Sequence, residues 1–590
     1  MQSEIKICQN CKSQFVIDPE DFSFYEKIQV PPPTFCYECR TVRRLAFRNE
    51  LNLYKRKCAA PEHGEEMISI YAPEKPLVIY DQKFWWTDGW DPFACGRPYD
   101  FSKPFFQQWL ELRNSFPLMS VSNSNAINSD YCNVADQSKD CYLISGSFNC
   151  EKTMYSNRVN QIKDSSDLHV AHRSELCYDG VYLSDCYRVL LSKNCWHCLD
   201  AYFLYDCRNC SNCFGCVNLR NKQYCFFNEQ LSKDEYAKRL KELDLGDYAT
   251  VKKLKDKFVE LQSRAIHKYA DILHSVNVVG DKVDNAKNCY YAFDITDGAE
   301  DSKYIHWGGL GVQDVYDGGP GVGIVNNAYE VFDTGLEGSM NLFTSVVYGS
   351  NNVRYAFNCY NCSDLFGCIG LRSKQYCILN KQYAKEEYEG LVPKIIAHMN
   401  EMPYVDGRGR VYGYGEFFPM ELSPFAYNES VAQDYFPLTK EEAAKRGYSW
   451  RENEERHYEQ TMAASQLPDN IRDVSDDILK QVIECEHKGV CNDNCTVAFK
   501  FIPAELQFYR RIGIPLPHFC FKCRHYARLR QRHPLKTWRR QCACDYKVHN
   551  NTIKHAHHLQ GRCSNEFETI YAPDRPEIVY CESCYNSEVV

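Results

Sequence analysis

The cysteines near the two ends of the chain are spaced as metal ligands are. Near the start, a pair separated by two residues is followed after 24 residues by a second such pair; near the end, a pair separated by three residues is again followed after 24 residues by a close pair. Two close pairs complete the four-thiolate tetrahedron that structural zinc prefers. The predicted ligands are Cys8, Cys11, Cys36 and Cys39, and Cys491, Cys495, Cys520 and Cys523.

Zinc is the favoured occupant of these two quartets, and iron or free thiols are the alternatives. Iron in a rubredoxin-like site would use the same four thiolates. Catalytic zinc is disfavoured because it keeps one coordination position open, and both quartets are full. The chain contains 33 cysteines and starts with a polar segment unlike a secretory signal. We therefore expect a reducing, cytoplasmic location, where cysteines persist as thiols or bind metal.

The last fifty residues predict a further zinc site. The close pair Cys581 and Cys584 would join Cys563 and one of Cys542 and Cys544. The protein is thus expected to hold two to three structural zinc ions. Three histidines between these cysteines are interpreted as loop residues that donate only if a cysteine is not available; they are His555, His557 and His558.

A cluster of arginines follows each quartet and could bind nucleic acid. Compact cationic segments with interleaved aromatic residues can contact phosphates by charge and bases by stacking, so RNA or DNA is a candidate partner. The alternative is that these arginines pair with the acidic remainder of the protein. The candidates are Arg40, Arg43, Arg44 and Arg48, and Arg524, Arg528, Arg530, Arg532, Arg539 and Arg540.

The residues between the cysteine pairs carry a family resemblance. An aromatic residue, an acidic residue, Phe-Tyr, proline and a final arginine occupy matching positions in both copies: Phe15, Glu20, Phe24, Tyr25, Pro33 and Arg40, and Phe499, Glu505, Phe508, Tyr509, Pro517 and Arg524. Both segments resemble the trcl-type zinc-ribbon family of bacterial proteins, and the whole chain resembles long bacterial proteins with terminal zinc ribbons around a cysteine-rich repeat. The resemblance implies zinc ribbons and no particular reaction. The extra residue between Cys491 and Cys495 departs from the pattern, so Cys485 is an alternative ligand there.

The middle of the chain is repetitive and duplicated. From Cys132 to Cys225, cysteines recur nine residues apart, often after Asp or Asn and before an aromatic residue. A nine-residue unit of strand and polar turn is typical of a parallel β-solenoid. Residues 206–228 and 358–380 are two versions of one segment. Within it, the run Cys207, Cys210, Cys213 and Cys216 could hold a cluster, but Leu365 replaces the third cysteine in the second copy, which favours a buried core role.

These patterns predict a mainly β, multidomain protein: terminal zinc ribbons flank a duplicated parallel β-solenoid with helical caps. Helical patterns over 233–268 and 381–399 would cover exposed strand edges. The predicted boundaries are residues 1–60 for the N-terminal ribbon with its basic segment, 61–120 for an aromatic-rich packing segment, 121–228 and 280–380 for the solenoid halves, 229–279 and 381–402 for the caps, 403–475 for a linker, and 476–590 for the C-terminal zinc region.

Composition narrows the function without identifying it. The 590 residues are 44% apolar and carry a net charge of −9, which is typical of a folded protein rather than a disordered one. No window is apolar enough to span a membrane. The favoured function is a zinc-stabilised scaffold that contacts nucleic acid. The second candidate is a platform for protein partners or self-association through the solenoid. An enzyme is disfavoured because no nucleophile elbow, phosphate loop or open metal site is present.

Overall fold

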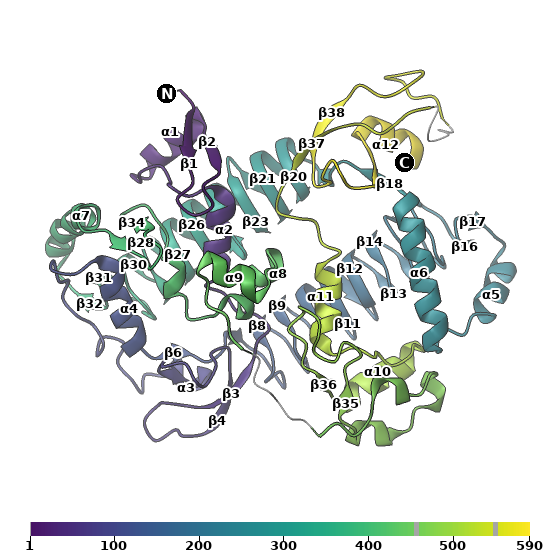
Figure 1. Cartoon of the computed structure of the whole chain (residues 1–590), viewed down its shortest axis with the longest axis horizontal. Helices are drawn as coiled ribbons and strands as arrows, with labels where there is room; N and C mark the ends of the chain where they lie inside the picture. Colours follow the sequence, from purple (N-terminus) through teal and green to yellow (C-terminus); the bar gives the residue numbers. More distant parts are fainter. Residues whose placement is uncertain (1, 453–458, 547–552) are drawn as a thin grey trace.

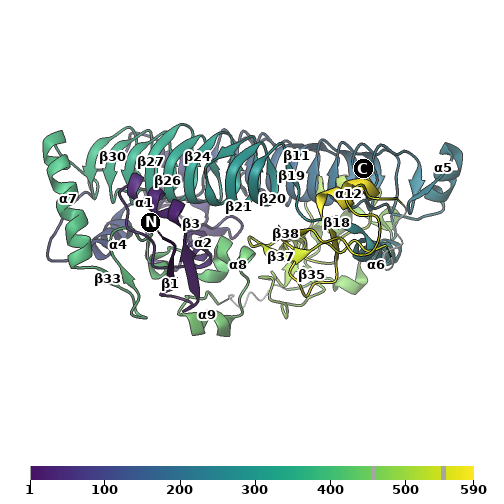
Figure 2. The ribbon, with the colours of Figure 1, turned by 90° about the horizontal axis from the view of Figure 1, so that it is seen from above.

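Two large parallel sheets form the body of the protein. The computed structural model describes residues 2–452, 459–546 and 553–590. In Figure 2 the strands of both sheets form a row along the long axis of the molecule, with α5 (Lys233–Lys241) at one end and α7 (Lys385–Glu401) at the other. The protein is therefore rich in parallel sheet, with helices at the ends and on one side.

The first sheet, here called the first stack, contains nine strands joined in parallel. Its strands are β7 (Asn123–Ser124), β8 (Asn133–Asp136), β9 (Ser145–Phe148), β10 (Asn157–Lys163), β11 (Ser166–Glu175), β12 (Tyr178–Ser184), β13 (Tyr187–Leu190), β14 (Lys193–Trp196) and β15 (Leu199–Tyr202). The register pairs Asn157 with His169, His169 with Val181 and Val181 with Lys193. Neighbouring strands are thus offset by twelve residues, and the predicted nine-residue unit is wrong.

The local unit of the first stack has three residues. From Val134 to Phe227, every third residue has a positive φ. The buried core residues between Cys132 and Cys225 are likewise separated by multiples of three. The left-handed residue in each three-residue unit changes the direction of the chain. Four such units make up the twelve-residue offset between neighbouring strands. Asn and Asp occupy many of these turning positions because their short polar side chains tolerate the left-handed region.

The second stack repeats this design with an offset that varies: Ile272 pairs with Val283, eleven residues on, and the offset is longer in the middle of the stack. Tyr290 pairs with Lys303, thirteen residues on, whereas Val353 pairs with Leu365, twelve residues on. The strands are β19 (Ile272–Leu273), β20 (Val276–Asp284), β21 (Ala286–Thr296), β22 (Ala299–Glu300), β23 (Lys303–Gly309), β24 (Val312–Gly318), β25 (Val322–Gly323), β26 (Val325–Gly335), β27 (Gly338–Tyr348), β28 (Asn351–Arg354), β29 (Phe357–Tyr360), β30 (Ser363–Phe366), β31 (Gln375–Ile378) and β32 (Lys381–Gln382). Gly298 and Gly311 supply positive φ at the extra residue of the thirteen-residue spacing.

The helices predicted to cap the sheets lie beside their ends. The first helical stretch is two helices, α5 and α6 (Tyr248–Arg264), which follow a short hairpin of β16 (Cys225–Phe226) and β17 (Glu229–Gln230). The second stack likewise ends in the β31–β32 hairpin before α7. Each hairpin occupies the last strand edge, so the edge is covered by the protein's own chain.

A small cysteine-containing unit packs on each stack. The N-terminal cysteine module (residues 2–48) has β1 (Glu4–Ile7), β2 (Gln14–Ile17), α1 (Pro19–Lys27) and α2 (Tyr37–Leu45). The C-terminal cysteine module (residues 483–535) has β35 (Ile483–Glu484), β36 (Ala498–Phe499), α10 (Pro503–Ile512) and α11 (Phe521–Leu529). Figure 1 shows α2 beside β26 and α11 beside β11, and residues of these element pairs are in contact.

The remaining segments pack around these units. The aromatic-rich segment after the N-terminal module includes β3 (Tyr54–Lys57), β4 (Glu66–Ser69), β5 (Ile79–Tyr80), α3 (Gln82–Trp85), α4 (Phe105–Ser115) and β6 (Leu118–Met119). It packs on the second stack, where the Phe105 ring centroid lies 5.3 Å from that of Phe366. The segment before the C-terminal module includes β33 (Tyr404–Val405), β34 (Val411–Tyr412), α8 (Val431–Tyr435) and α9 (Lys440–Arg446).

The chain ends in a C-terminal segment (residues 537–590) that docks beside α6. Its elements are β37 (Trp538–Gln541), β38 (Glu566–Thr569), β39 (Ile578–Tyr580) and α12 (Glu582–Val589). Strand β39 pairs with β18 (Ile266–Lys268), directly after α6. Within the described residues, no helix is both long and apolar enough to cross a membrane.

Candidate metal centres

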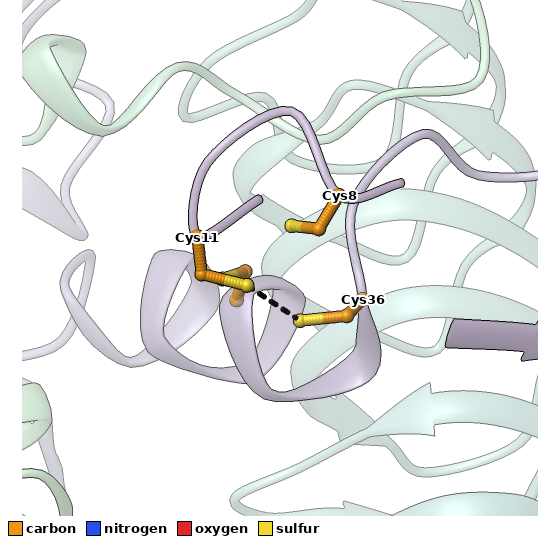
Figure 3. A group of neighbouring side chains, drawn as sticks. Cys8, Cys11 and Cys36 are labelled. Carbon is orange, nitrogen blue, oxygen red and sulfur yellow. Dashed lines mark hydrogen bonds between the residues drawn. The ribbon is translucent and has the colours of Figure 1, made fainter. Parts of the chain in front are cut away.

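The first quartet converges at the N-terminus of α2. Cys8 directly follows β1, Cys11 lies in the hairpin, Cys36 is the N-cap of α2 and Cys39 lies in its first turn. Their four sulfur atoms lie within 4.8 Å of one another. Figure 3 shows the side chains of Cys8, Cys11 and Cys36 directed toward a common point, with 3.7 Å between the sulfurs of Cys11 and Cys36.

These separations fit a tetrahedral ion. With metal–sulfur bonds of about 2.3 Å, the edge of a regular tetrahedron is about 3.8 Å. The Cys11–Cys36 separation of 3.7 Å is close to that edge. Hydrogen bonds from the thiols of Cys36 and Cys39 also hold the pKa of Cys8 well below its usual range. The same contacts raise the pKa values of Cys36 and Cys39, so without an ion the quartet favours one thiolate, at Cys8.

The second quartet forms with Cys485 in place of Cys491. The sulfurs of Cys485, Cys495, Cys520 and Cys523 gather within 4.8 Å, and all four side chains are buried. The Cys485 and Cys523 sulfurs are 3.8 Å apart and those of Cys520 and Cys523 are 3.5 Å apart. Cys491 lies at the margin, with its sulfur 3.7 Å from that of Cys523. The four gathered sulfurs are therefore those of the alternative quartet, in which Cys485 is the ligand, and Cys491 lies beside it.

The hairpins explain why Cys485 joins the second quartet. Cys8 directly follows β1, and its N–H donates to the carbonyl of Ser13. Cys485 directly follows β35, and its N–H donates to the carbonyl of Val497. The two cysteines thus occupy the same place in their hairpins. The second hairpin is longer, and Cys491 falls within the additional residues.

The C-terminal segment forms a third group of four cysteines. Cys542 joins Cys563, Cys581 and Cys584, and all four are buried. Of the two alternatives, Cys542 is the one that gathers with the other three cysteines. A hydrogen bond with the Cys542 thiol lowers the pKa of Cys581 to about 4, while the pKa values of Cys542 and Cys584 are raised, so without an ion one thiolate is favoured, at Cys581.

Cys544 belongs to a different group, which the sequence interpretation missed. Its sulfur lies 3.5 Å from His555 Nδ1 and 3.3 Å from His558 Nε2. Together with Cys584 these residues form a second set of four donors within 4.8 Å. A third histidine, His557, has its Nε2 3.1 Å from the Cys584 sulfur. The signal was present as three histidines within four residues among five cysteines.

The arginines after the first quartet are buried in ion pairs. Arg40 and Arg44 lie one helical turn apart on α2 and share the carboxylate of Asp317, at 2.8 and 3.1 Å. Arg43 contacts Glu330 at 2.6 Å, and Arg48 contacts Asp333 at 2.6 Å. These carboxylates belong to β24 and β26 of the second stack.

The second module repeats this arrangement on the first stack. Arg524 and Arg528, again one turn apart, share the carboxylate of Asp167 on β11, at 3.1 and 2.6 Å. Arg40 and Arg524 also each donate to the carbonyl of the residue before the second cysteine pair, Phe35 or Phe519. The i, i+4 spacing of these arginines therefore serves to dock each helix on a stack.

The other four candidate arginines occupy different places. Arg530 is more than half exposed and pairs with Asp493 at 2.7 Å. Arg539 is largely exposed and pairs with Glu566 at 2.5 Å. Arg532 and Arg540 are half-buried, and each donates to backbone carbonyls. The ten arginines thus do not form one cationic surface, and six of them are paired inside the protein.

The cysteines of the stacks lie in buried rows of the core. Cys207 and Cys216 are fully buried, and the Cys207 thiol donates to the Cys216 carbonyl at 3.6 Å. In the second stack Leu365 is fully buried in the matching core, where it pairs with Cys377. Leucine and cysteine thus fill equivalent apolar positions, as the duplicated sequence predicts.

A groove of about 640 Å³ lies between the two stacks. Residues of β9, β10, β11, β12 and β14 line one side, and residues of β19, β20, β21, β23 and β25 line the other. Its aromatic lining residues are Phe148, Tyr182, Trp196 and Trp307. Arg158 lies at its wall, 2% exposed, with its guanidinium 4.5 Å from the ring centroid of Trp307.

Arg158 is unusual among the buried arginines. Within the described residues it forms no ion pair, and its Nε and Nη1 atoms have no hydrogen-bond partner. Burial lowers its pKa to about 10. A buried guanidinium without a carboxylate is costly, and such a group beside a groove indicates a place where an acceptor can bind.

The comparisons with known proteins leave the family open. No protein-family model matches this chain, and no curated protein matches it.

Proposed function

We propose that the protein is a structural-zinc scaffold in which two zinc ribbons hold helices α2 and α11 on the two halves of a parallel β-solenoid. The observation that carries this proposal is the repeated link from cysteine group to helix to stack. In both modules, arginines placed one turn apart behind the second cysteine pair bury their charge against one aspartate of a stack. A closed thiolate quartet fixes the start of each of these helices.

The solenoid interpretation is supported by the strand registers. Successive strands pair in parallel at offsets of twelve or thirteen residues through most of both sheets. A chain that returns to the same side after a fixed interval stacks on its own preceding turn, as repeat proteins do. The nearly constant offset supports two solenoid halves that share one core pattern.

The groove between the halves is the proposed binding surface. It combines aromatic faces with many polar and charged groups, among them five aspartates and the cationic Arg158, Arg173 and Lys282. Aromatic and polar groups together are found in small-molecule sites. The unpaired guanidinium of Arg158 suits a ligand with a carboxylate or phosphate group. Binding there would make the protein a ligand-binding scaffold.

The two partner classes favoured by sequence have weaker support. Nucleic-acid contact would fall on the exposed Arg530 and Arg539, since the arginines of α2 and α11 are committed to carboxylates. Protein docking would use the tyrosines of the second stack, but residues of the N-terminal cysteine module already cover some of them. Phe24 stacks on Tyr316 with ring centroids 3.9 Å apart, and Tyr37 stacks on Tyr304 at 4.8 Å.

Metal analysis with hydrogen exchange tests the scaffold proposal. Zinc should be present in each four-cysteine group, and chelation should raise exchange in the two modules while the β27–β30 region stays protected, because repeats are stabilised by their neighbours. Cys36→Ser should release one zinc ion and affect the N-terminal module alone. Iron with visible absorption, fewer than two zinc ions per chain, or global unfolding on chelation would contradict the proposal.

A further inference from the structure

The C-terminal segment gathers more donor atoms than one metal ion can use. Five buried cysteines and three histidines lie close together, His555 buried, His558 half-buried and His557 exposed, and a tetrahedral ion takes four ligands. Seven of these donors form two sets of four that share Cys584, and His557 joins His558, Cys563 and Cys584 in an alternative set. The sets are Cys542, Cys563, Cys581 and Cys584, and Cys544, His555, His558 and Cys584.

The separations in the second set match a tetrahedral ion bound by sulfur and nitrogen. With metal–sulfur bonds of about 2.3 Å and metal–nitrogen bonds of about 2.05 Å, the edges are about 3.6 Å between sulfur and nitrogen and about 3.3 Å between nitrogens. Cys544 lies 3.5 and 3.3 Å from the two histidine nitrogens, and those nitrogens are 3.3 Å apart. The Cys584 sulfur is 3.4 Å from His558 Nε2.

A carboxylate orients one of the histidines. His555 is fully buried, its Nδ1 faces Cys544, and its Nε2 contacts Glu588 of α12 at 2.8 Å. Metal-binding histidines commonly donate their second ring N–H to a carboxylate, which fixes the tautomer and raises the basicity of the ligand nitrogen. The backbone N–H of His555 also donates to the hydroxyl of Tyr546 at 2.6 Å.

We propose that the C-terminal segment binds two zinc ions, one by four cysteines and one by two cysteines and two histidines, with the Cys584 thiolate bridging them. This inference rests on the proposal that the cysteine groups bind zinc. It raises the expected total to four ions, because each of the other two modules holds one. The second ion would join the loop before β38 to helix α12.

Native mass spectrometry of the zinc-loaded full chain tests the two-ion site. The unaltered protein should carry four ions, and His555→Gln and Cys542→Ser should each carry three. If His555→Gln keeps the count of the unaltered protein, the second ion is absent and the inference is overturned. Failure of the underlying proposal looks different, because Cys36→Ser and Cys520→Ser would then release no ion.

A variant that keeps every ligand guards against simple misfolding. Glu588→Gln should lower the affinity for one of the four ions by about 10- to 100-fold in chelator competition. Losses of this size are typical when a carboxylate that holds a metal-binding histidine is removed. Glu582→Gln, on the same helix but paired with Lys268 at the surface, is the matched control and should leave all four ions unchanged. Equal behaviour of the two variants would overturn the assignment of Glu588.

Discussion

The carboxylate of Asp317 provides the sharpest test of how the N-terminal module is held. Its two oxygens face Arg40 and Arg44, and all three side chains are at most 3% exposed. Asp317→Asn would leave two buried guanidinium groups without their carboxylate. Breaking a buried pair by removing one partner costs about 3 to 5 kcal/mol. Arg44 also lies 3.6 Å from Glu330, so we expect the lower end of this range.

Hydrogen exchange measures this loss locally. A cost of about 3 to 5 kcal/mol corresponds to an increase of about 140- to 4,000-fold in the opening equilibrium of the module. Amides of residues 2–48 should therefore exchange faster, with little change in β27 and β28. The matched control is Asp314→Asn on the same strand, whose carboxylate pairs with the half-exposed Lys27 at 3.0 Å. That surface pair contributes less than about 1 kcal/mol.

Two outcomes would refute this reasoning. If Asp317→Asn and Asp314→Asn changed exchange equally, the buried arginines would not be what holds α2 in place. A double-mutant cycle with Arg44→Met isolates the pair, because neighbouring residues in one network give interaction energies of about 0.5 to 3 kcal/mol. A coupling near zero would equally contradict the structure.

Three further predictions follow from the sites. Cys485→Ser should release one zinc ion, whereas Cys491→Ser should keep the zinc count, as measured by native mass spectrometry. Arg528→Ala should lower stability by about 3 to 5 kcal/mol in denaturant unfolding because Asp167 loses a buried partner; an unchanged midpoint with weaker RNA binding would instead support a nucleic-acid role. Phosphate or citrate should raise the melting temperature of the protein, and Arg158→Leu should abolish that rise; an equal rise in the variant would contradict the groove site.

Much of the cysteine chemistry could be predicted because ligand spacing is local. Cys36 and Cys39 lie on one helical turn, so their separation in sequence fixes their separation in space. The gathering of Cys485 with the other three was harder to predict, because a hairpin can lengthen without moving its ends. Cys485 keeps its place next to β35 while the turn between it and Cys495 grows.

The period of the stacks was harder to predict. Cysteines nine residues apart are separated by three of the three-residue units. Neighbouring strands are separated by four units, which is twelve residues. The Cys195 thiol donates to the Leu204 carbonyl nine residues later, so the nine-residue spacing reflects a real contact between layers. The number of three-residue units between neighbouring strands depends on the left-handed residue in each unit. Most residue types occupy that position here, so the sequence does not mark it.

The role of the arginines depends on partners that lie far away in sequence. Arg40 and Asp317 are 277 positions apart, so no local pattern could reveal their ion pair. Basic residues one turn apart on a helix are equally suited to a phosphate surface or to a buried carboxylate. Only the placement of β24 beside α2 selects the second role.

This placement connects the metal centres to the groove. In each module the second cysteine pair begins the helix, so an ion bound there fixes the direction in which the following arginines point. Those arginines reach Asp317 on one stack and Asp167 on the other. The groove runs between β9 to β14 and β19 to β25, next to these anchored strands. In the scaffold that we propose, the ions orient the helices at a distance from the groove. The helices hold β11, which lines the groove, and β24, which pairs with the lining strand β23.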